Sequence, residues 1–273
     1  MSESEGDYLL RTDQEELARM GLQHSLWRPV AEDLWEAAKI DTGMRVLDLG
    51  CGPGDASMDL AERVGPEGSV LAIDRSSSFL SHLRERVKEK GWEGRVETKK
   101  ADFCKLGLET ESLDAVWARW AFCWDPDPSA TLAQVAQALR PGGILIVQDY
   151  LMYGGLRLDP REPAFERVVE AVLRSWEDSG GDPDICSRLP SLIGDSDLFL
   201  EQDIHLTRTI SPDEPMWEWP TTFFLSFVPE LVELGLLDGE EAEAFEKAWE
   251  RASSNPATRF PLPPMRGQIA KKS

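Results

Sequence analysis

Residues 46–55, with the sequence VLDLGCGPGD, constrain the fold of this chain more than any other segment. An apolar run of strand type ends in Gly50, Gly52 and Gly54 and leads directly into a helical pattern. Glycines at such a turn let the backbone approach a ligand closely, and the N-terminus of the next helix faces that ligand. The segment therefore predicts a strand, a glycine turn and a helix that together bind a nucleotide-like ligand.

The spacing of the glycines separates two kinds of ligand. A dinucleotide site of this type has its third glycine five residues after the first, where the helix packs on the strand. Here that position holds Asp55, and the third glycine is Gly54. A carboxylate repels a pyrophosphate but attracts a ligand that carries an ammonium and a sulfonium. The loop favours a cation-bearing nucleoside over a dinucleotide.

Four further apolar runs of strand type follow, with helical patterns between them. They are residues 70–74, 96–101, 113–120 and 144–147. A helix that begins after Asp127 carries Leu139 on its apolar face and stops at the sequence PGG of residues 141–143. Alternating strands and helices predict an α/β fold with a parallel sheet.

In this order the segments resemble the motifs of class I S-adenosylmethionine (SAM)-dependent methyltransferases over residues 44–150. The resemblance implies a Rossmann-like α/β fold: a seven-stranded, mostly parallel sheet with helices on both faces, an N-terminal helical cap and a lid insertion after strand five. It implies SAM as cofactor and S-adenosylhomocysteine as product. We expect one structural domain made of a cap (1–43), a SAM-binding core (44–150), a substrate lid (151–198) and the remaining strands and helices (199–273).

The resemblance also assigns cofactor contacts. Asp74 takes the ribose hydroxyls, and Asp102 with Phe103 holds the adenine. Arg19 and Gln23 of the cap either reach the cofactor carboxylate or form a solvated pair. The full set of expected cofactor contacts is Arg19, Gln23, Asp48, Gly50, Cys51, Gly52, Asp55, Asp74, Arg75, Asp102, Phe103 and Arg119.

A hydroxyl or ammonium acceptor must lose a proton, so a nearby base helps methyl transfer. Asp149, at the end of the fifth strand, is the first candidate for this base, or else it only orients the substrate. His205, in a sixth strand expected over 199–209, and His24 in the cap are weaker candidates. The residues expected to contact the acceptor are Trp120, Trp124 and Tyr150.

Outside the core, periodicity predicts further elements. Residues 7–40 predict two helices, and residues 162–176 predict a helix in the lid. The aromatic cluster over 216–227 either packs in the core or lines an apolar substrate pocket. Residues 267–271 predict an edge strand that closes the sheet.

Composition restricts the partners. A net charge of −21 disfavours DNA, RNA and anionic membranes, since binding to polyanions needs Lys and Arg. The four cysteines show neither CxxC spacing nor clustering with the three histidines, so we expect no metal site. The acidic residues 1–5 do not resemble a signal peptide, and no apolar run approaches about 20 residues. We expect a cytoplasmic monomer or homodimer.

These observations converge on an enzyme that transfers a methyl group from SAM to a small aromatic or apolar molecule by in-line displacement. An NAD-dependent oxidoreductase is one alternative, because it shares the strand, turn and helix. A module that binds SAM without turnover is the other.

Overall fold

Seven strands form one sheet, in the spatial order β3-β2-β1-β4-β5-β9-β6. In the computed structural model, which describes residues 14–273, β1 to β5 pair in parallel, and β9 pairs antiparallel with β5 and β6. The predicted seven-stranded, mostly parallel sheet is confirmed. Its strands are β1 (Arg45–Leu49), β2 (Ser69–Asp74), β3 (Val96–Lys100), β4 (Leu113–Arg119), β5 (Leu139–Tyr150), β6 (Leu198–Leu206) and β9 (Met265–Lys272).

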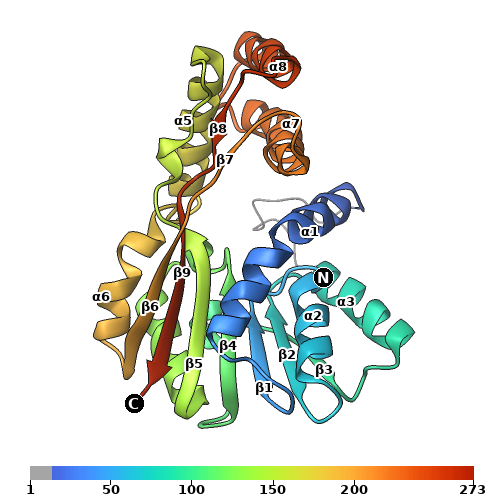
Figure 1. The fold of residues 1–273 in the computed structure, drawn as a ribbon, viewed down its shortest axis with the longest axis vertical. Coiled ribbons are helices and arrows are strands. Elements are labelled where there is room, and N and C mark those ends of the chain that lie inside the picture. The colour runs from blue at the N-terminus through green and yellow to red at the C-terminus, as the bar shows by residue number, and fades with distance from the viewer. Residues whose placement is uncertain (1–13) are drawn as a thin grey trace, which may run out of the picture.

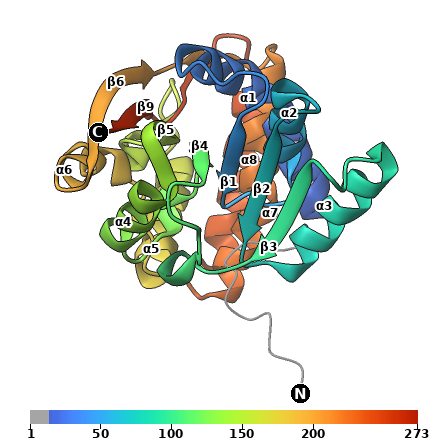
Figure 2. The same cartoon turned by 90° about the horizontal axis from the view of Figure 1, so that it is seen from below.

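Helices cover both faces of the sheet because successive side chains of a buried strand point to opposite faces. In β1, Leu47 and Leu49 belong to one apolar core, and Val46 belongs to the other. Figure 2 shows α1, α2 and α3 on one face and α4 and α6 on the other. These helices are α1 (Gln14–Ala37), α2 (Asp55–Val64), α3 (Ser77–Lys90), α4 (Pro128–Ala138) and α6 (Leu189–Gly194).

One continuous helix, α1, replaces the two helices predicted over residues 7–40. Pro29 lies inside it and removes one backbone hydrogen bond. The side chains of Trp27, Ala31 and Leu34 on either side of Pro29 are all buried, and this shared packing keeps both halves of the helix in line. The part of the prediction over 7–13 lies outside the described residues.

The strand predicted over 267–271 is present but is not an edge, which corrects that expectation. It belongs to β9, which lies between β5 and β6, so β6 is the edge strand. The strand predicted over 199–209 ends at Leu206, and β7 (Thr209–Ile210) pairs separately with β8 (Phe260–Pro261). A further correction concerns Leu139, which pairs with Leu113 in the sheet instead of extending α4.

A second layer of helices lies beyond the carboxyl ends of the strands (Figure 1). It comprises α5 (Pro163–Asp178), α7 (Glu218–Glu233) and α8 (Gly239–Ser254). Phe165 of α5 joins them, since its ring centroid lies 5.1 Å from that of Phe224 in α7 and 5.8 Å from that of Trp249 in α8. Its helices come from two of the expected segments: α5 from the lid (151–198), and α7 and α8 from the C-terminal part (199–273).

Within residues 14–273, no helix combines the length and the apolar character that a membrane span requires.

Candidate active site

The glycine turn between β1 and α2 has the backbone that its sequence predicts. Gly50, Gly52 and Gly54 have φ values of 71°, 53° and 86°, in the left-handed region that favours glycine. A Cβ atom on Gly54 would lie 2.4 Å from Leu83 of α3, and one on Gly50 would lie 3.0 Å from the Cβ of Ala121. Close packing therefore requires glycine here, and the turn forms one wall of a cavity at the carboxyl ends of the strands.

Asp74, the last residue of β2, faces this turn. One carboxylate oxygen accepts a hydrogen bond from the backbone N–H of Gly52 at 2.9 Å, and the other accepts from Ser76 at 2.7 Å. Burial raises the pKa of Asp74, and these two backbone donors partly offset the rise. The carboxylate lines the cavity and has further acceptor positions for the hydroxyls of a ligand.

Asp48 lies beneath the same turn on the face of the sheet covered by α1 and α2. Burial raises its pKa to about 6, although the hydroxyl of Ser57 donates to it at 2.6 Å and lowers that value. The Arg119 guanidinium also favours the charged form of Asp48. The Cys51 side chain is buried between the glycines, and burial raises the pKa of its thiol.

Asp55 begins α2 and lines the cavity, as expected, but its carboxylate forms an ion pair with Arg86 of α3 at 2.8 Å. Arg86 therefore offsets the negative charge that favoured a cationic ligand at this position. Arg75 is exposed at the rim of the cavity. Asp102 and Phe103 lie at the rim too, and the Phe103 ring approaches Gly50, with 3.6 Å between its Cζ atom and a Cβ built on that glycine.

Helix α1 supplies the opposite wall through Arg19, Met20, Gln23 and His24. Arg19 is held by Glu16, with nitrogen-to-oxygen distances of 2.7 and 2.6 Å. Its remaining terminal nitrogen donates to Gln23 at 3.2 Å. Arg19 is buried in this pairing, so the alternative of a solvated Arg19–Gln23 pair is wrong.

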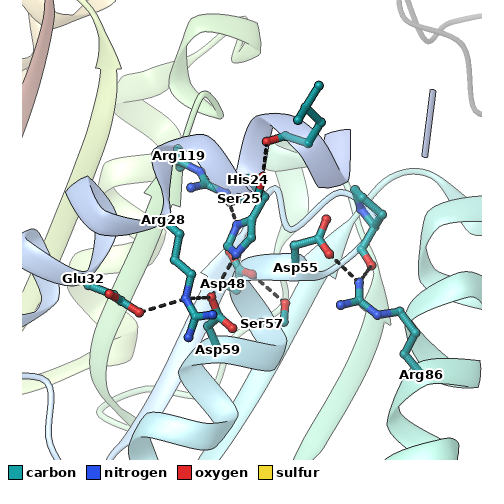
Figure 3. Close-up of polar contacts among 12 residues, drawn as sticks. His24, Ser25, Arg28, Glu32, Asp48, Asp55, Ser57, Asp59, Arg86 and Arg119 are labelled. Carbon is teal, nitrogen blue, oxygen red and sulfur yellow. Dashed lines mark hydrogen bonds and ion pairs between the residues drawn. The ribbon is translucent and has the colours of Figure 1, made fainter. Parts of the chain in front are cut away.

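His24 connects three elements across the cavity. Figure 3 shows it between Asp59 of α2 and Arg119 of β4. Its Nδ1 atom lies 2.8 Å from Arg119, and its Nε2 atom lies 2.9 Å from the Asp59 carboxylate. Since a guanidinium only donates, we infer that Nδ1 accepts and that Nε2 carries the proton. Both ring nitrogens are therefore occupied, and His24 positions Arg119.

The Arg119 guanidinium is only partly engaged in hydrogen bonds. One terminal nitrogen donates to His24, whereas the other is buried and has no hydrogen-bond partner among the described residues. Burial lowers the pKa of this guanidinium, and Asp48 is the strongest of the nearby charges that oppose the effect. A buried donor without a partner costs free energy, which makes this nitrogen a candidate contact for an anionic group in the cavity.

Aromatic side chains surround the other end of the cavity. Trp120 follows β4 with a φ of 49°, which is unfavourable for any residue except glycine. Its ring stacks on Trp219 at 6.0 Å and on Tyr150 at 6.2 Å. Strain retained next to a cavity is typical of functional positions. We call this end the acceptor chamber; its wall includes Trp120, Trp124, Tyr150, Tyr153, Leu156, Trp176, Trp219, Phe223, Phe224, Phe260 and Pro263.

The two expected catalytic residues lie outside the cavity wall. Asp149 is fully buried, and its carboxylate accepts from the backbone N–H groups of Cys123 and Tyr150 at 3.1 and 2.9 Å. Burial raises its pKa to about 7. Asp149 thus fixes the loop after β4, and it is not among the residues that line the cavity. His205 is exposed on the edge strand β6, opposite Arg266, and does not line the cavity either.

Sequence reasoning missed Tyr153 and Trp176 of the chamber. Their rings lie 4.7 Å apart, and Tyr153 also packs on Tyr150 at 5.1 Å. Tyr153 lies only three residues beyond the predicted site residue Tyr150, which was the available signal. No sequence signal pointed to Trp176, because a tryptophan on the apolar face of a helix is equally typical of a protein core.

The aromatic cluster over 216–227 serves both predicted purposes: Trp219 lines the chamber, whereas Trp217 stacks on Trp249 at 5.1 Å.

Comparison with known proteins agrees with this architecture. Residues 46–143 match the family described as "Methyltransferase domain". The core is a class I methyltransferase domain. The resemblance that the sequence motifs carry is thereby confirmed, and the match favours a methyltransferase over the dinucleotide-dependent oxidoreductase.

Two curated relatives align with the methyltransferase domain. The chain is 34% identical over 127 residues to the methyltransferase GfsG of Streptomyces halstedii, covering 46% of this chain and 45% of GfsG. It is 33% identical over 124 residues to the demethylmenaquinone methyltransferase of Lactococcus lactis, covering 45% of this chain and 48% of that protein. The chain thus spans about half the length of these relatives.

A solved structure extends the comparison beyond the domain. The geranyl diphosphate C-methyltransferase of Streptomyces coelicolor A3(2) superposes with a TM-score of 0.58 over 91% of this chain and 77% of that protein. The sequence identity is 16%, so the likeness concerns the fold alone.

Among the described residues, no three His, Cys, Asp or Glu side chains are grouped to hold a metal ion. The four cysteines, Cys51, Cys104, Cys123 and Cys186, form no disulfide.

Proposed function

We propose that this chain transfers a methyl group from SAM to a small apolar acceptor. One observation carries the proposal: a single cavity of about 280 Å³ joins the glycine turn and Asp74 at one end to the aromatic chamber at the other. A cavity of roughly 300 to 1,000 Å³ with apolar walls and few polar groups is usual for small-molecule sites. A methyl donor and an acceptor can therefore meet inside one enclosure.

The residues at the turn fit SAM. Backbone without side chains at Gly50 and Gly52 leaves room for the nucleoside, and Asp74 offers carboxylate oxygens for its ribose. Asp102 and Phe103 at the rim would hold the adenine. The unpartnered nitrogen of Arg119 fits the carboxylate of the methionine part better than Arg19 does, because Glu16 already occupies Arg19.

When bound, SAM supplies a methyl group on a positively charged sulfur, which an electron pair of the acceptor displaces in line. The protein's own contribution is to position the acceptor and to exclude water. Trp120 lines the cavity directly after Arg119 in the chain, and its ring is fixed by Trp219 and Tyr150. In the helical layer, α5 contributes Trp176 and α7 contributes Trp219 and Phe223 to the wall of the chamber.

The names of similar proteins support a small acceptor. One relative is named for demethylmenaquinone and one solved structure for geranyl diphosphate, and both names denote small molecules. We therefore propose a small and largely apolar molecule as the acceptor of this chain.

Calorimetric titration with S-adenosylhomocysteine tests the cofactor part. We expect saturable binding that weakens about 10-fold or more in Asp74→Asn, since that change removes a charged hydrogen-bond acceptor. Asp114→Asn is the matched control: its carboxylate also accepts one backbone N–H, from Arg45 at 2.7 Å, but it lies outside the cavity. Absence of binding in the unmodified protein would refute the proposal.

Turnover separates an enzyme from a binding module. Incubation with radiolabelled SAM and a panel of small aromatic and apolar acceptors should give a methylated product. Binding of S-adenosylhomocysteine without product across a broad panel would instead favour the module that binds SAM without turnover.

A further inference from the structure

The acceptor chamber extends from the sheet into the helical layer. Tyr150 is the last residue of β5 and Trp120 directly follows β4, and both line the chamber. Phe224 of α7 and Phe260 of β8 line it as well, and α7 and β8 lie beyond the strand ends (Figure 1). The chamber therefore continues from the strand ends into the layer that α5, α7 and α8 form.

The part of the wall that α7 and β8 supply is apolar. Its residues carry one polar side-chain group, the indole N–H of Trp219, and this group already donates to Gln23 at 2.9 Å. The lining residues of these two elements are Trp219, Pro220, Phe223, Phe224 and Phe260. Since these side chains leave no hydrogen-bonding group for a ligand, this part of the wall favours hydrocarbon.

Phe224 and Phe260 close the chamber at this end, because they are only 1% and 0% exposed. Behind them lies Phe165 of α5, whose ring centroid is 5.1 Å from that of Phe224 and 5.5 Å from that of Phe260. Trp249 of α8 contacts the same two rings, at 5.7 and 5.9 Å. Neither Phe165 nor Trp249 lines the cavity. The two lining rings therefore separate the chamber from the packed aromatic rings of α5 and α8.

We propose that Phe224 and Phe260 are specificity-determining residues that limit how far the apolar part of the acceptor extends from the atom that receives the methyl group. The acceptor is then an elongated molecule whose hydrocarbon part enters the helical layer. Because protein interiors are close-packed, a chain that reaches these two rings cannot continue without displacing them. This inference rests on the proposed methyl transfer and specifies the shape of its acceptor.

The affinity for straight-chain primary alcohols tests the length limit. Alcohols from butanol to dodecanol are measured by calorimetry with the protein saturated with S-adenosylhomocysteine. Each methylene group that enters the chamber should increase the affinity roughly fourfold. We expect the increase to stop at one chain length, because further methylene groups find no room beyond Phe224 and Phe260.

Variants that shorten either side chain should move this limit. Phe224→Ala and Phe260→Ala each remove the six ring carbons, and neighbouring side chains fill such a space only in part. We expect the limit to increase by about three methylene groups in each alanine variant. Phe224→Leu and Phe260→Leu disturb the packing less and should increase it by about one. Where urea unfolding shows that an alanine variant is not folded, the leucine variant decides.

Phe245→Ala is the matched control. Phe245 of α8 is fully buried too, and its ring centroid lies 5.9 Å from that of Phe224 and 6.5 Å from that of Phe165. It does not line the cavity. Its truncation leaves a similar space among the same rings, but Phe224 and Phe260 still close the chamber. We therefore expect an unchanged length limit.

The outcomes are separable from those of the proposed function. Failure of S-adenosylhomocysteine to bind contradicts the methyltransferase proposal itself. With normal cofactor binding, three results each overturn the length limit alone. They are an affinity that does not rise with chain length and then level off in the unmodified protein, an unchanged limit in folded variants of Phe224 and Phe260, and an equal shift of the limit in Phe245→Ala.

Discussion

The Nδ1 atom of His24 lies 2.8 Å from a guanidinium nitrogen of Arg119, although the two residues are 95 positions apart in the chain. This contact ties the cap helix α1 to the end of β4, directly beside the cavity. Because Asp59 holds the other ring nitrogen, the imidazole cannot turn away without losing a second bond. The cap and the sheet therefore share one polar connection that aims Arg119 at the cofactor end of the cavity.

Replacing His24 by alanine should weaken cofactor binding. Arg119 would lose the acceptor that holds its side chain beside the cavity, and its guanidinium could turn toward Asp48. We expect about 10-fold weaker binding of S-adenosylhomocysteine by calorimetry, the loss typical of one hydrogen bond to a charged group. His24→Gln, whose side-chain oxygen can accept from Arg119, should recover part of the affinity. Equal losses in both variants would contradict the positioning role.

Cofactor affinity should decrease below about pH 6. The pKa of Asp48 is raised to about 6 by burial, so this carboxylate becomes neutral as the pH falls through that value. A neutral Asp48 no longer attracts the ammonium and sulfonium of SAM. We expect S-adenosylhomocysteine, which keeps the ammonium, to bind several-fold more weakly at pH 5 than at pH 8. The affinity of Asp48→Asn should show little of this dependence; an unchanged pH profile would exclude Asp48 as the responsible group.

Asp149 should make the folded state less stable as the pH rises. Its pKa is raised to about 7 in the folded protein, above the ordinary value of 3.8. The folded state therefore holds a proton that the unfolded chain releases, and stability is lost as the pH rises from about 4 through 7. Relative to the unmodified protein, Asp149→Asn should gain on the order of 2 kcal/mol between pH 5 and pH 8 in urea unfolding. Parallel stability curves would contradict this.

Trp120 should reverse the usual order of alanine and glycine substitutions. Its φ of 49° strains any residue with a Cβ atom, by about 1 kcal/mol. Both Trp120→Ala and Trp120→Gly lose the stacked rings, but only the glycine variant relieves the strain. We expect Trp120→Gly to be the more stable of the two by about 1 kcal/mol in denaturant unfolding. Trp124, which does not have a positive φ, should show the ordinary order, with alanine at least as stable as glycine.

Gly54 should tolerate alanine far less than Gly91 does. Both have positive φ, at 86° and 67°, so an alanine strains the backbone at either position. A Cβ on Gly54 would overlap Leu83, whereas none of the described atoms lies within 4 Å of a Cβ on Gly91. We expect Gly91→Ala to cost about 1 kcal/mol and Gly54→Ala about 1 to 3 kcal/mol more, from overpacking. Similar losses would mean that α3 moves away freely from the turn.

The sequence by itself determined the local elements of the core. The glycine positions 50, 52 and 54 required a left-handed turn, and the runs that end at Asp74 and Asp102 are short and bounded by turn residues. Such signals depend on a few neighbouring residues only, and so the local structure that they predict is found in the fold. The match of residues 46–143 to the methyltransferase family rests on the same local segments.

Tertiary packing decided which side chains face the cavity. Asp149 lies near the end of β5 as the sequence indicated, but the loop after β4 folds over its carboxylate: the Cys123 N–H donates to one oxygen, and the Tyr150 N–H donates to the other. The register of β9 between β5 and β6 left His205 on an exposed edge. Tyr153, Trp176 and Trp219 line one cavity only because α5 and α7 pack above the strand ends. Contacts between such distant segments depend on the packing of whole elements, which no local pattern of residues encodes, whereas the glycine turn depends only on the backbone of its own residues.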